Sequence, residues 1–305
     1  MTKIRNITII GSFAGLWVAT LFSTKAELVL GFLLILTFGI IHGSNDLLLI
    51  EKLFTKEKKR SFIKSLFFYV LTVLLTFIAF YTIPSITVIL FVLFSAYHFG
   101  EQHWESKVDA QHKLLSAILQ LSYGALILMI LFYFNEQQVE DIVLAITGVT
   151  FPHLFLLYAL YIVLAVFIIT GAILTFKSDS FKKLVLKELF FLGLLIVIFK
   201  MSSLIWGFTI YFVLWHSLPS LFEQIHFIYG RFTNQTIWFY IKNALPYWII
   251  SIIGIGLSYF WLQESVLFFA IFFSFIAAVT FPHSLIISLM FKKKWCAIPL
   301  ILPPT

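Results

Sequence analysis

Apolar residues occur in runs of about 20 along the whole chain, separated by short polar segments. A run of that length can cross the hydrocarbon part of a bilayer as one helix. The pattern therefore predicts an all-α protein, a polytopic transmembrane helical bundle of about ten spans (8–10). The predicted spans cover residues 7–22, 28–50, 62–82, 84–104, 113–134, 151–176, 184–200, 203–227, 243–262 and 265–291.

Two stretches allow a second interpretation. Residues 141–176 are nearly uncharged and fit either one span with a preceding segment or a re-entrant pair of helices. Residues 1–27 resemble a signal peptide, because Lys3 and Arg5 precede an apolar run, but no small-residue cleavage site ends it. We interpret this stretch as the first helix. No linker or shift in composition divides the chain, which predicts a single integral membrane domain over residues 1–305.

Hydrophobic residues make up 61% of the chain and charged residues only 11%, which would leave large apolar patches exposed on a soluble protein. With the N- and C-termini cytoplasmic, the predicted spans leave only Lys25 and Lys200, of 21 Lys and Arg, on the outer side. The net charge of +7 therefore requires no nucleic acid as partner, and we expect a multi-pass protein of the cell inner (plasma) membrane. The segments NEQQVEDIVLAITGV (outside) and IYGRFTNQTIWFYIK (inside) are expected to form interfacial helices.

Four of the eight histidines lie at similar depths in predicted spans that all run from outside to inside. At 1.5 Å per residue, these depths are roughly 20 to 27 Å below the outer edge, a layer about 7 Å thick. A single buried histidine usually packs with a hydrogen bond, but four in one layer predict a shared metal site, since ionisable groups in a membrane are costly and commonly functional. The predicted ligands are His42, His98, His216 and His283.

Polar residues follow three of these histidines at helical spacing: Asp46, Glu101 and Ser220 come three or four positions later. A metal-bound imidazole needs an acceptor for its second nitrogen, which such a neighbour can supply. The alternative is that Asp46 and Glu101 simply reach the inner headgroup region. His103 is predicted to be interfacial, with a supporting role at the site as the alternative, and His153 would join only if the region 141–176 is re-entrant.

An all-imidazole set suits Zn, Cu, Fe or Ni and disfavours Mg and Ca. The lone Cys296 rules out a thiolate cluster and an internal disulfide. Four neutral ligands in octahedral geometry leave two positions open, an arrangement suited to Fe(2+) that activates dioxygen beside an apolar substrate.

Four segments carry a family resemblance: HGSNDLLL at 42–49, SAYHFGEQHW at 95–104, LWHSLPSL at 214–221 and FPHSLIISL at 281–289. Together they resemble the Brp/Blh family of bacterial and archaeal β-carotene 15,15′-dioxygenases, in the right order and over most of the chain. The resemblance implies an integral membrane, non-haem iron enzyme that cleaves the central double bond of β-carotene with O2 into two molecules of retinal. It also implies a retinal-binding microbial rhodopsin as a downstream partner.

The resemblance implies that His42, His98 and His216 are iron ligands. Some members carry a further histidine where this chain has Ser220. We therefore expect His283 as the fourth ligand, with a three-histidine site completed by water as the alternative.

Other function classes remain as alternatives. Membrane di-iron desaturases and hydroxylases need about eight histidines in clusters such as HxxxH, which this chain lacks. A haem-carrying electron carrier would use histidine pairs on facing helices. A membrane transporter would use the histidines as a proton relay, without iron or dioxygen. The 37 Phe, 12 Tyr and 8 Trp either line a tunnel for a polyene or pack helices and anchor them at the interfaces.

Overall fold

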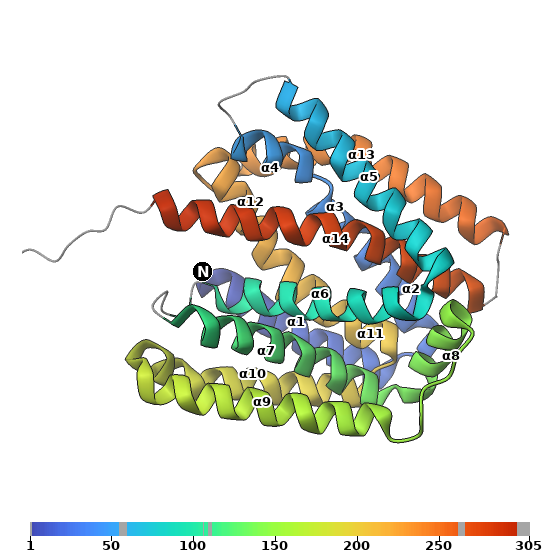
Figure 1. The fold of residues 1–305 in the computed structure, drawn as a ribbon, viewed down its shortest axis with the longest axis vertical. Coiled ribbons are helices and arrows are strands. Elements are labelled where there is room, and N and C mark those ends of the chain that lie inside the picture. The colour runs from blue at the N-terminus through green and yellow to red at the C-terminus, as the bar shows by residue number, and fades with distance from the viewer. Residues whose placement is uncertain (1, 55–59, 106, 109–111, 262–265, 298–305) are drawn as a thin grey trace, which may run out of the picture.

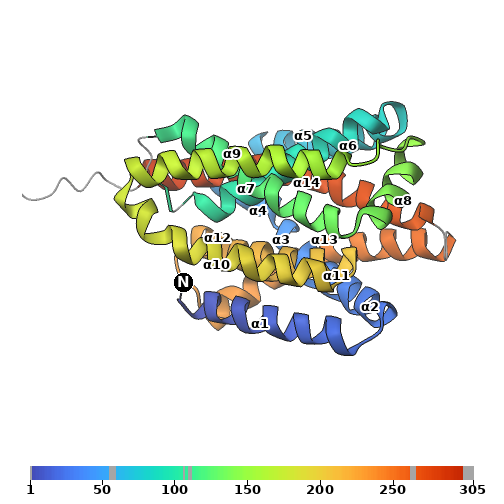
Figure 2. The ribbon, with the colours of Figure 1, turned by 90° about the horizontal axis from the view of Figure 1, so that it is seen from below.

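The structure, a computed structural model, describes residues 2–54, 60–105, 107–108, 112–261 and 266–297. All elements in these ranges are helical, and most run side by side along one common direction (Figures 1 and 2). The elements are α1 (Thr2–Leu21), α2 (Thr24–Leu34), the π-helix η1 (Ile35–Gly39), α3 (Ile40–Gly43), α4 (Asp46–Leu53), α5 (Arg60–Thr82), α6 (Pro84–Trp104), α7 (Lys113–Phe134), α8 (Glu136–Thr147), α9 (Phe155–Lys177), α10 (Asp179–Met201), α11 (Leu204–Thr209), the π-helix η3 (Ile210–Ser217), α12 (Leu218–Tyr229), α13 (Asn234–Trp261) and α14 (Val266–Ala297).

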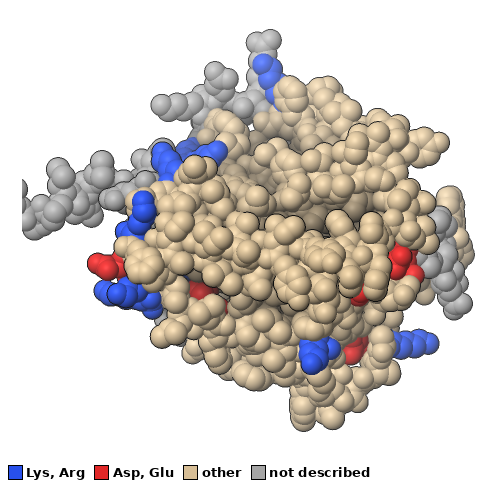
Figure 3. All heavy atoms as spheres, turned by 60° about the horizontal axis from the view of Figure 1, so that its bottom comes forward, with Lys and Arg blue, Asp and Glu red and all other residues tan. Residues whose placement is uncertain are grey.

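The prediction of an all-α polytopic membrane protein is confirmed. Within the described residues, nine helical stretches are long and apolar enough to cross a membrane. The predicted span 184–200 forms helix α10, which has sufficient length but carries too many charged residues to be among the nine. Many large apolar side chains face outward, as expected where a protein meets lipid. On the face in Figure 3, Lys and Arg gather mainly at the left end, in keeping with the predicted orientation.

The two interpretations of residues 141–176 are resolved in favour of one span with a preceding segment. That preceding segment is α8, which contacts α14 and ends at Gly148 in the left-handed conformation (φ 69°), and the span is α9. The inner segment, residues 228–242, was expected to form an interfacial helix of its own, and the structure differs from that expectation. The residues of this segment from Asn234 onward form the first turns of α13, which continues through Pro246, so they belong to a long helix.

Two of the long helical stretches that carry the predicted ligands contain π-helical turns. His42 lies just after the π-helix η1, and His216 lies inside the π-helix η3. An extra residue per turn shifts the direction of every later side chain, and such turns are frequent at functional sites. The stretch that carries His42 is also broken at Ser44 and Asn45, between His42 and the start of α4.

Helices α6 and α7 pack with their backbones in contact. A Cβ added at Gly100 would lie 1.7 Å from the carbonyl oxygen of Gln120, and one at Gly124 would lie 1.8 Å from that of Ala96. Only glycine permits this approach, which is the small-residue packing common in membrane bundles. The contact fixes α6, the helix that carries His98, against the largest apolar core cluster of the described residues.

Gly100→Ala is expected to destabilise the protein by at least about 1–3 kcal/mol, because the added methyl group forces two helix backbones apart. Thermal unfolding of the detergent-solubilised protein measures the effect. The matched control is Gly171→Ala in α9, where an added Cβ meets nothing within 4 Å. Equal melting temperatures for the two variants would contradict this account of the contact between α6 and α7.

Candidate metal centre

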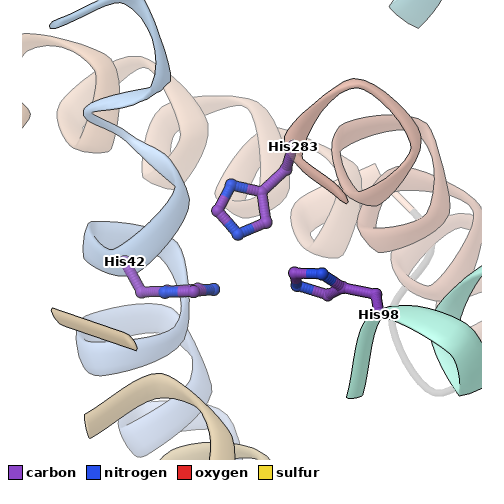
Figure 4. Close-up of side chains that lie close together, drawn as sticks. All are labelled: His42, His98 and His283. Carbon is purple, nitrogen blue, oxygen red and sulfur yellow. The ribbon is translucent and has the colours of Figure 1, made fainter. Parts of the chain in front are cut away.

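The four predicted histidine ligands lie together in the interior. They come from four separate elements, α3, α6, η3 and α14, and each is at most 4% exposed. Figure 4 shows the rings of His42, His98 and His283 converging from three helices. The rings form a closed cycle of edge contacts, with centroid distances of 4.4 Å for His42–His283, 5.2 Å for His283–His98, 4.7 Å for His98–His216 and 5.0 Å for His216–His42.

Three of these residues have the spacing of metal ligands. His42, His98 and His283 each offer a ring nitrogen, and these nitrogens all lie within 4.8 Å of one another. An imidazole nitrogen binds a transition metal at about 2.0–2.1 Å, so two ligands of one ion lie at most about 4.2 Å apart. Small side-chain movements would therefore close the triad on an ion. His216 is not part of this triad, although its ring contacts those of His42 and His98, and its role as a ligand stays a prediction.

Several ring nitrogens at this centre have no partner. Both nitrogens of His98, Nδ1 of His216 and Nε2 of His283 are buried without a hydrogen bond to the described residues. A buried polar atom left unpaired costs about 1–3 kcal/mol. A metal ion among the rings would satisfy one nitrogen of each ligand, and an all-imidazole donor set suits Zn, Cu, Fe or Ni. The residues present therefore fit a metal ion.

Asp46 holds one of these rings. Its Oδ1 accepts a hydrogen bond from Nδ1 of His283 at 2.7 Å, and its Oδ2 accepts one from the Tyr69 hydroxyl at 3.1 Å. With its proton on Nδ1, the ring of His283 keeps the lone pair on Nε2 for a metal, and the carboxylate fixes the orientation of the ring. The sequence spacing suggested His42 as the partner of Asp46. The break at Ser44 and Asn45 removes the helical spacing between them, and the carboxylate reaches α14 instead.

Ser220 reaches the site only through Gln224. Nε2 of Gln224 lies 3.3 Å from Nδ1 of His42 and donates to the Ser220 hydroxyl at 3.1 Å, while the Tyr240 hydroxyl donates to Oε1 of Gln224 at 2.6 Å. The sequence pattern did not indicate Gln224, Tyr240 or Tyr69 as part of the site. Only Gln224 gave a signal, as a polar residue one helical turn after Ser220.

The described hydrogen bonds and ion pairs of the Glu101 and His103 side chains are with residues other than the four histidines. Glu101 accepts hydrogen bonds from Ser288 and, at 3.4 Å, from Tyr97. His103 contacts Glu188 of α10 at 2.7 Å, which agrees with the five-residue offset that turns it away from His98. His153 is exposed in the connection between α8 and α9.

The contact of His103 with α10 belongs to a separate buried ion cluster, in which Lys107 donates to the second oxygen of Glu188 at 3.0 Å. Burial lowers the pKa of Lys107, and the Glu188 carboxylate opposes that shift. This cluster joins the end of α6 to α10, and it explains how the buried carboxylate of Glu188 is tolerated on α10.

Glu188→Ala is expected to destabilise the protein by about 1–3 kcal/mol, since it leaves the half-buried ammonium group of Lys107 without a counter-charge. Glu188→Gln, which keeps a hydrogen-bond acceptor, should cost less. Thermal unfolding at neutral pH gives the ranking, with Glu51→Gln at an exposed position of α4 as the control. A cost no larger than that of the control would show that the cluster does not hold α10.

The four histidines line an apolar cavity of about 320 Å³. Some residues of its wall also lie on the outer surface, where Leu74 of α5 is 54% exposed and Ile250 of α13 is 68% exposed. The cavity therefore extends from the candidate metal centre to the lipid-facing surface at α5 and α13. The wall between this surface and the histidines is mostly apolar.

The fold and the site define an integral membrane protein with a buried all-histidine centre that faces an apolar cavity. A family model described as beta-carotene 15,15'-dioxygenase matches residues 33–291. The chain belongs to the beta-carotene 15,15'-dioxygenase family, as the sequence resemblance predicted, and at this level it is a carotene dioxygenase. The matched range contains all four histidines. Neither the search of curated proteins nor the search of solved structures found a match.

Proposed function

We propose that this protein is a non-haem iron dioxygenase that cleaves the central 15,15′ double bond of β-carotene with O2 to give two molecules of retinal. The observation that carries the proposal is a cluster of four buried imidazoles in contact with one another, three of them with ligand spacing, at an apolar cavity that reaches the lipid-facing surface. Family membership supports the same chemistry.

In this proposal, His42, His98 and His283 hold Fe(2+), and His216 is the fourth ligand. Fe(2+) bound there would supply the activation of dioxygen. Asp46 keeps the ring of His283 in the tautomer that presents Nε2, and Tyr69 holds the other oxygen of that carboxylate. The surrounding apolar side chains, among them Phe99 and Phe212, exclude water and hold the polyene.

The cavity suits a hydrocarbon substrate. β-Carotene dissolves in the bilayer because water expels its apolar surface. Entry at α5 and α13 would keep it out of water throughout, past side chains such as Val70, Leu74 and Ile250. We place the protein in the inner (plasma) membrane, with a retinal-binding rhodopsin as the proposed user of the product.

Expression in a β-carotene-producing bacterium tests the proposal. The cells should lose their orange colour and accumulate retinal, and the purified protein should lose activity with a chelator and regain it with Fe(2+) but not Zn(2+). Unchanged carotene in cells that contain the folded protein would overturn the proposed reaction. A histidine proton relay in a transporter would need neither iron nor dioxygen, so proton transport that survives both removals, in a protein that leaves β-carotene intact, would favour that class.

A further inference from the structure

A second apolar cavity, of about 110 Å³, lies beside the first. Helix α8 closes part of it with one face, because Val139, Ile142, Val143 and Ile146 all line the cavity and follow helical spacing. Helices α6 and α7 contribute further wall residues, such as Phe91 and Leu128. The short helix α8 thus covers a hollow in the bundle.

The two cavities share part of their walls, and two of the shared residues pack against His216. Phe99, Phe212, Ile276 and Thr280 line both cavities. The ring of Phe99 lies 4.7 Å from that of His216, and the ring of Phe212 stacks on His216 at 5.5 Å with an interplanar angle of 18°. The candidate metal centre therefore lies against the boundary between the cavities.

A symmetric cleavage places a requirement on the site. When the central double bond breaks and each of its carbons gains one oxygen atom of O2, the two products are equal in length. The polyene is rigid, so one half must extend beyond the metal centre as far as the other half extends before it. The first cavity reaches from the histidines to the lipid-facing surface, and the second begins behind Phe99 and Phe212.

Ser95 supplies an independent sign that the second cavity takes a ligand. Ser95 is one of the residues that line this cavity, it is 3% exposed, and its buried hydroxyl oxygen has no hydrogen-bond partner among the described residues. By contrast, the Thr280 hydroxyl donates to the carbonyl oxygen of Ile276 at 2.7 Å, which is the usual solution for a hydroxyl on a helix. Ser95 lies one helical turn before His98 and Phe99, on the second-cavity side of the centre.

We propose that the second cavity binds the half of the carotenoid that lies beyond the metal centre, and that Phe99 and Phe212 determine which double bond stands at the metal. Ser95 then donates a hydrogen bond to the aldehyde oxygen formed on that half. The proposal rests on the proposed function and deepens it. The depth of the second cavity sets how far the polyene can advance, and this selects the central double bond for cleavage.

Val143→Trp, which fills the second cavity from α8, tests the proposal against Leu144→Trp. Leu144 is the next residue of the same helix and is 44% exposed. With β-carotene as the substrate, Val143→Trp should lower kcat/KM for retinal formation by about 10-fold or more. The products should shift towards two aldehydes of unequal length, because the polyene can no longer advance until its central bond reaches the metal. Leu144→Trp should match the wild type, and bound iron should be the same in all three proteins.

Each result has a definite meaning. No retinal from the wild-type protein would reject the proposed function itself. An active wild type, with Val143→Trp giving wild-type rate and products, would reject only the role of the second cavity. A raised KM for O2 with unchanged products would also reject it, by assigning the cavity to dioxygen. If Val143→Trp does not fold, Ile146→Phe on the same wall replaces it with the same expected shift in products.

Discussion

His98→Ala should abolish retinal formation and remove most of the bound iron. Both ring nitrogens of His98 are buried without a hydrogen-bond partner among the described residues, and its ring contacts those of His216 and His283, so the substitution removes a ligand nitrogen from the middle of the cluster. Loss of one ligand from a buried centre also opens a cavity beside the remaining ones, which weakens their hold on the ion. Retinal in cells that make β-carotene and the metal content of the purified protein measure the effect.

His153→Ala is the control for that variant, because His153 is exposed and lies between α8 and α9, away from the four rings. It should retain wild-type retinal and iron. The same two measurements test whether His216 is a ligand. His216→Ala should lose retinal formation and bound iron, as His98→Ala does. Full activity of His98→Ala would end the assignment of this centre as the catalytic site.

Asp46→Ala should lower iron affinity or activity by about 10- to 100-fold, the range for groups that orient a metal ligand. Asp46 is 1% exposed, and its carboxylate accepts a hydrogen bond from Nδ1 of His283. Among the described residues, this is the only hydrogen bond of that ring. Asp46→Asn should cost less, because its amide oxygen can still accept from Nδ1 while the negative charge is lost. Activity as a function of added Fe(2+) measures both variants.

Asp141→Asn, at an exposed position of α8, controls for the loss of one acidic residue. A loss of activity in Asp46→Ala that excess Fe(2+) restores would place the effect in metal binding. A wild-type dependence on Fe(2+) in Asp46→Ala would mean that the carboxylate does not support the centre. Tyr69→Phe removes only one hydrogen bond to Asp46 and should have the smallest effect of the series.

The described residues bring together four histidines, which weighs against the membrane di-iron enzymes considered as an alternative. His103 lies in the ion cluster with Glu188, and His153 is exposed. A centre of the desaturase type needs about twice as many histidine ligands.

The sequence by itself determined the properties that depend on local pattern. Runs of apolar residues predicted nearly every membrane helix, because the thickness of the bilayer sets the length of a span. The depth of a residue in its span follows from counting positions along a helix, and this count placed His42, His98, His216 and His283 in one layer. The boundary of α12 with α13 was less well predicted, because the mostly polar residues 231–235 are typical of a segment outside the bilayer, although α13 already begins at Asn234.

Only the tertiary structure decided which side chains meet within that layer. The direction of a side chain depends on the rotation of its helix, and the π-turns before His42 and around His216 alter that rotation in a way that regular spacing cannot anticipate. Because the helix breaks after Gly43, Asp46 forms its hydrogen bond with His283 of α14. The two cavities and their shared wall also arise between elements distant in sequence, because packing in three dimensions, and not the order of residues, determines where space is left.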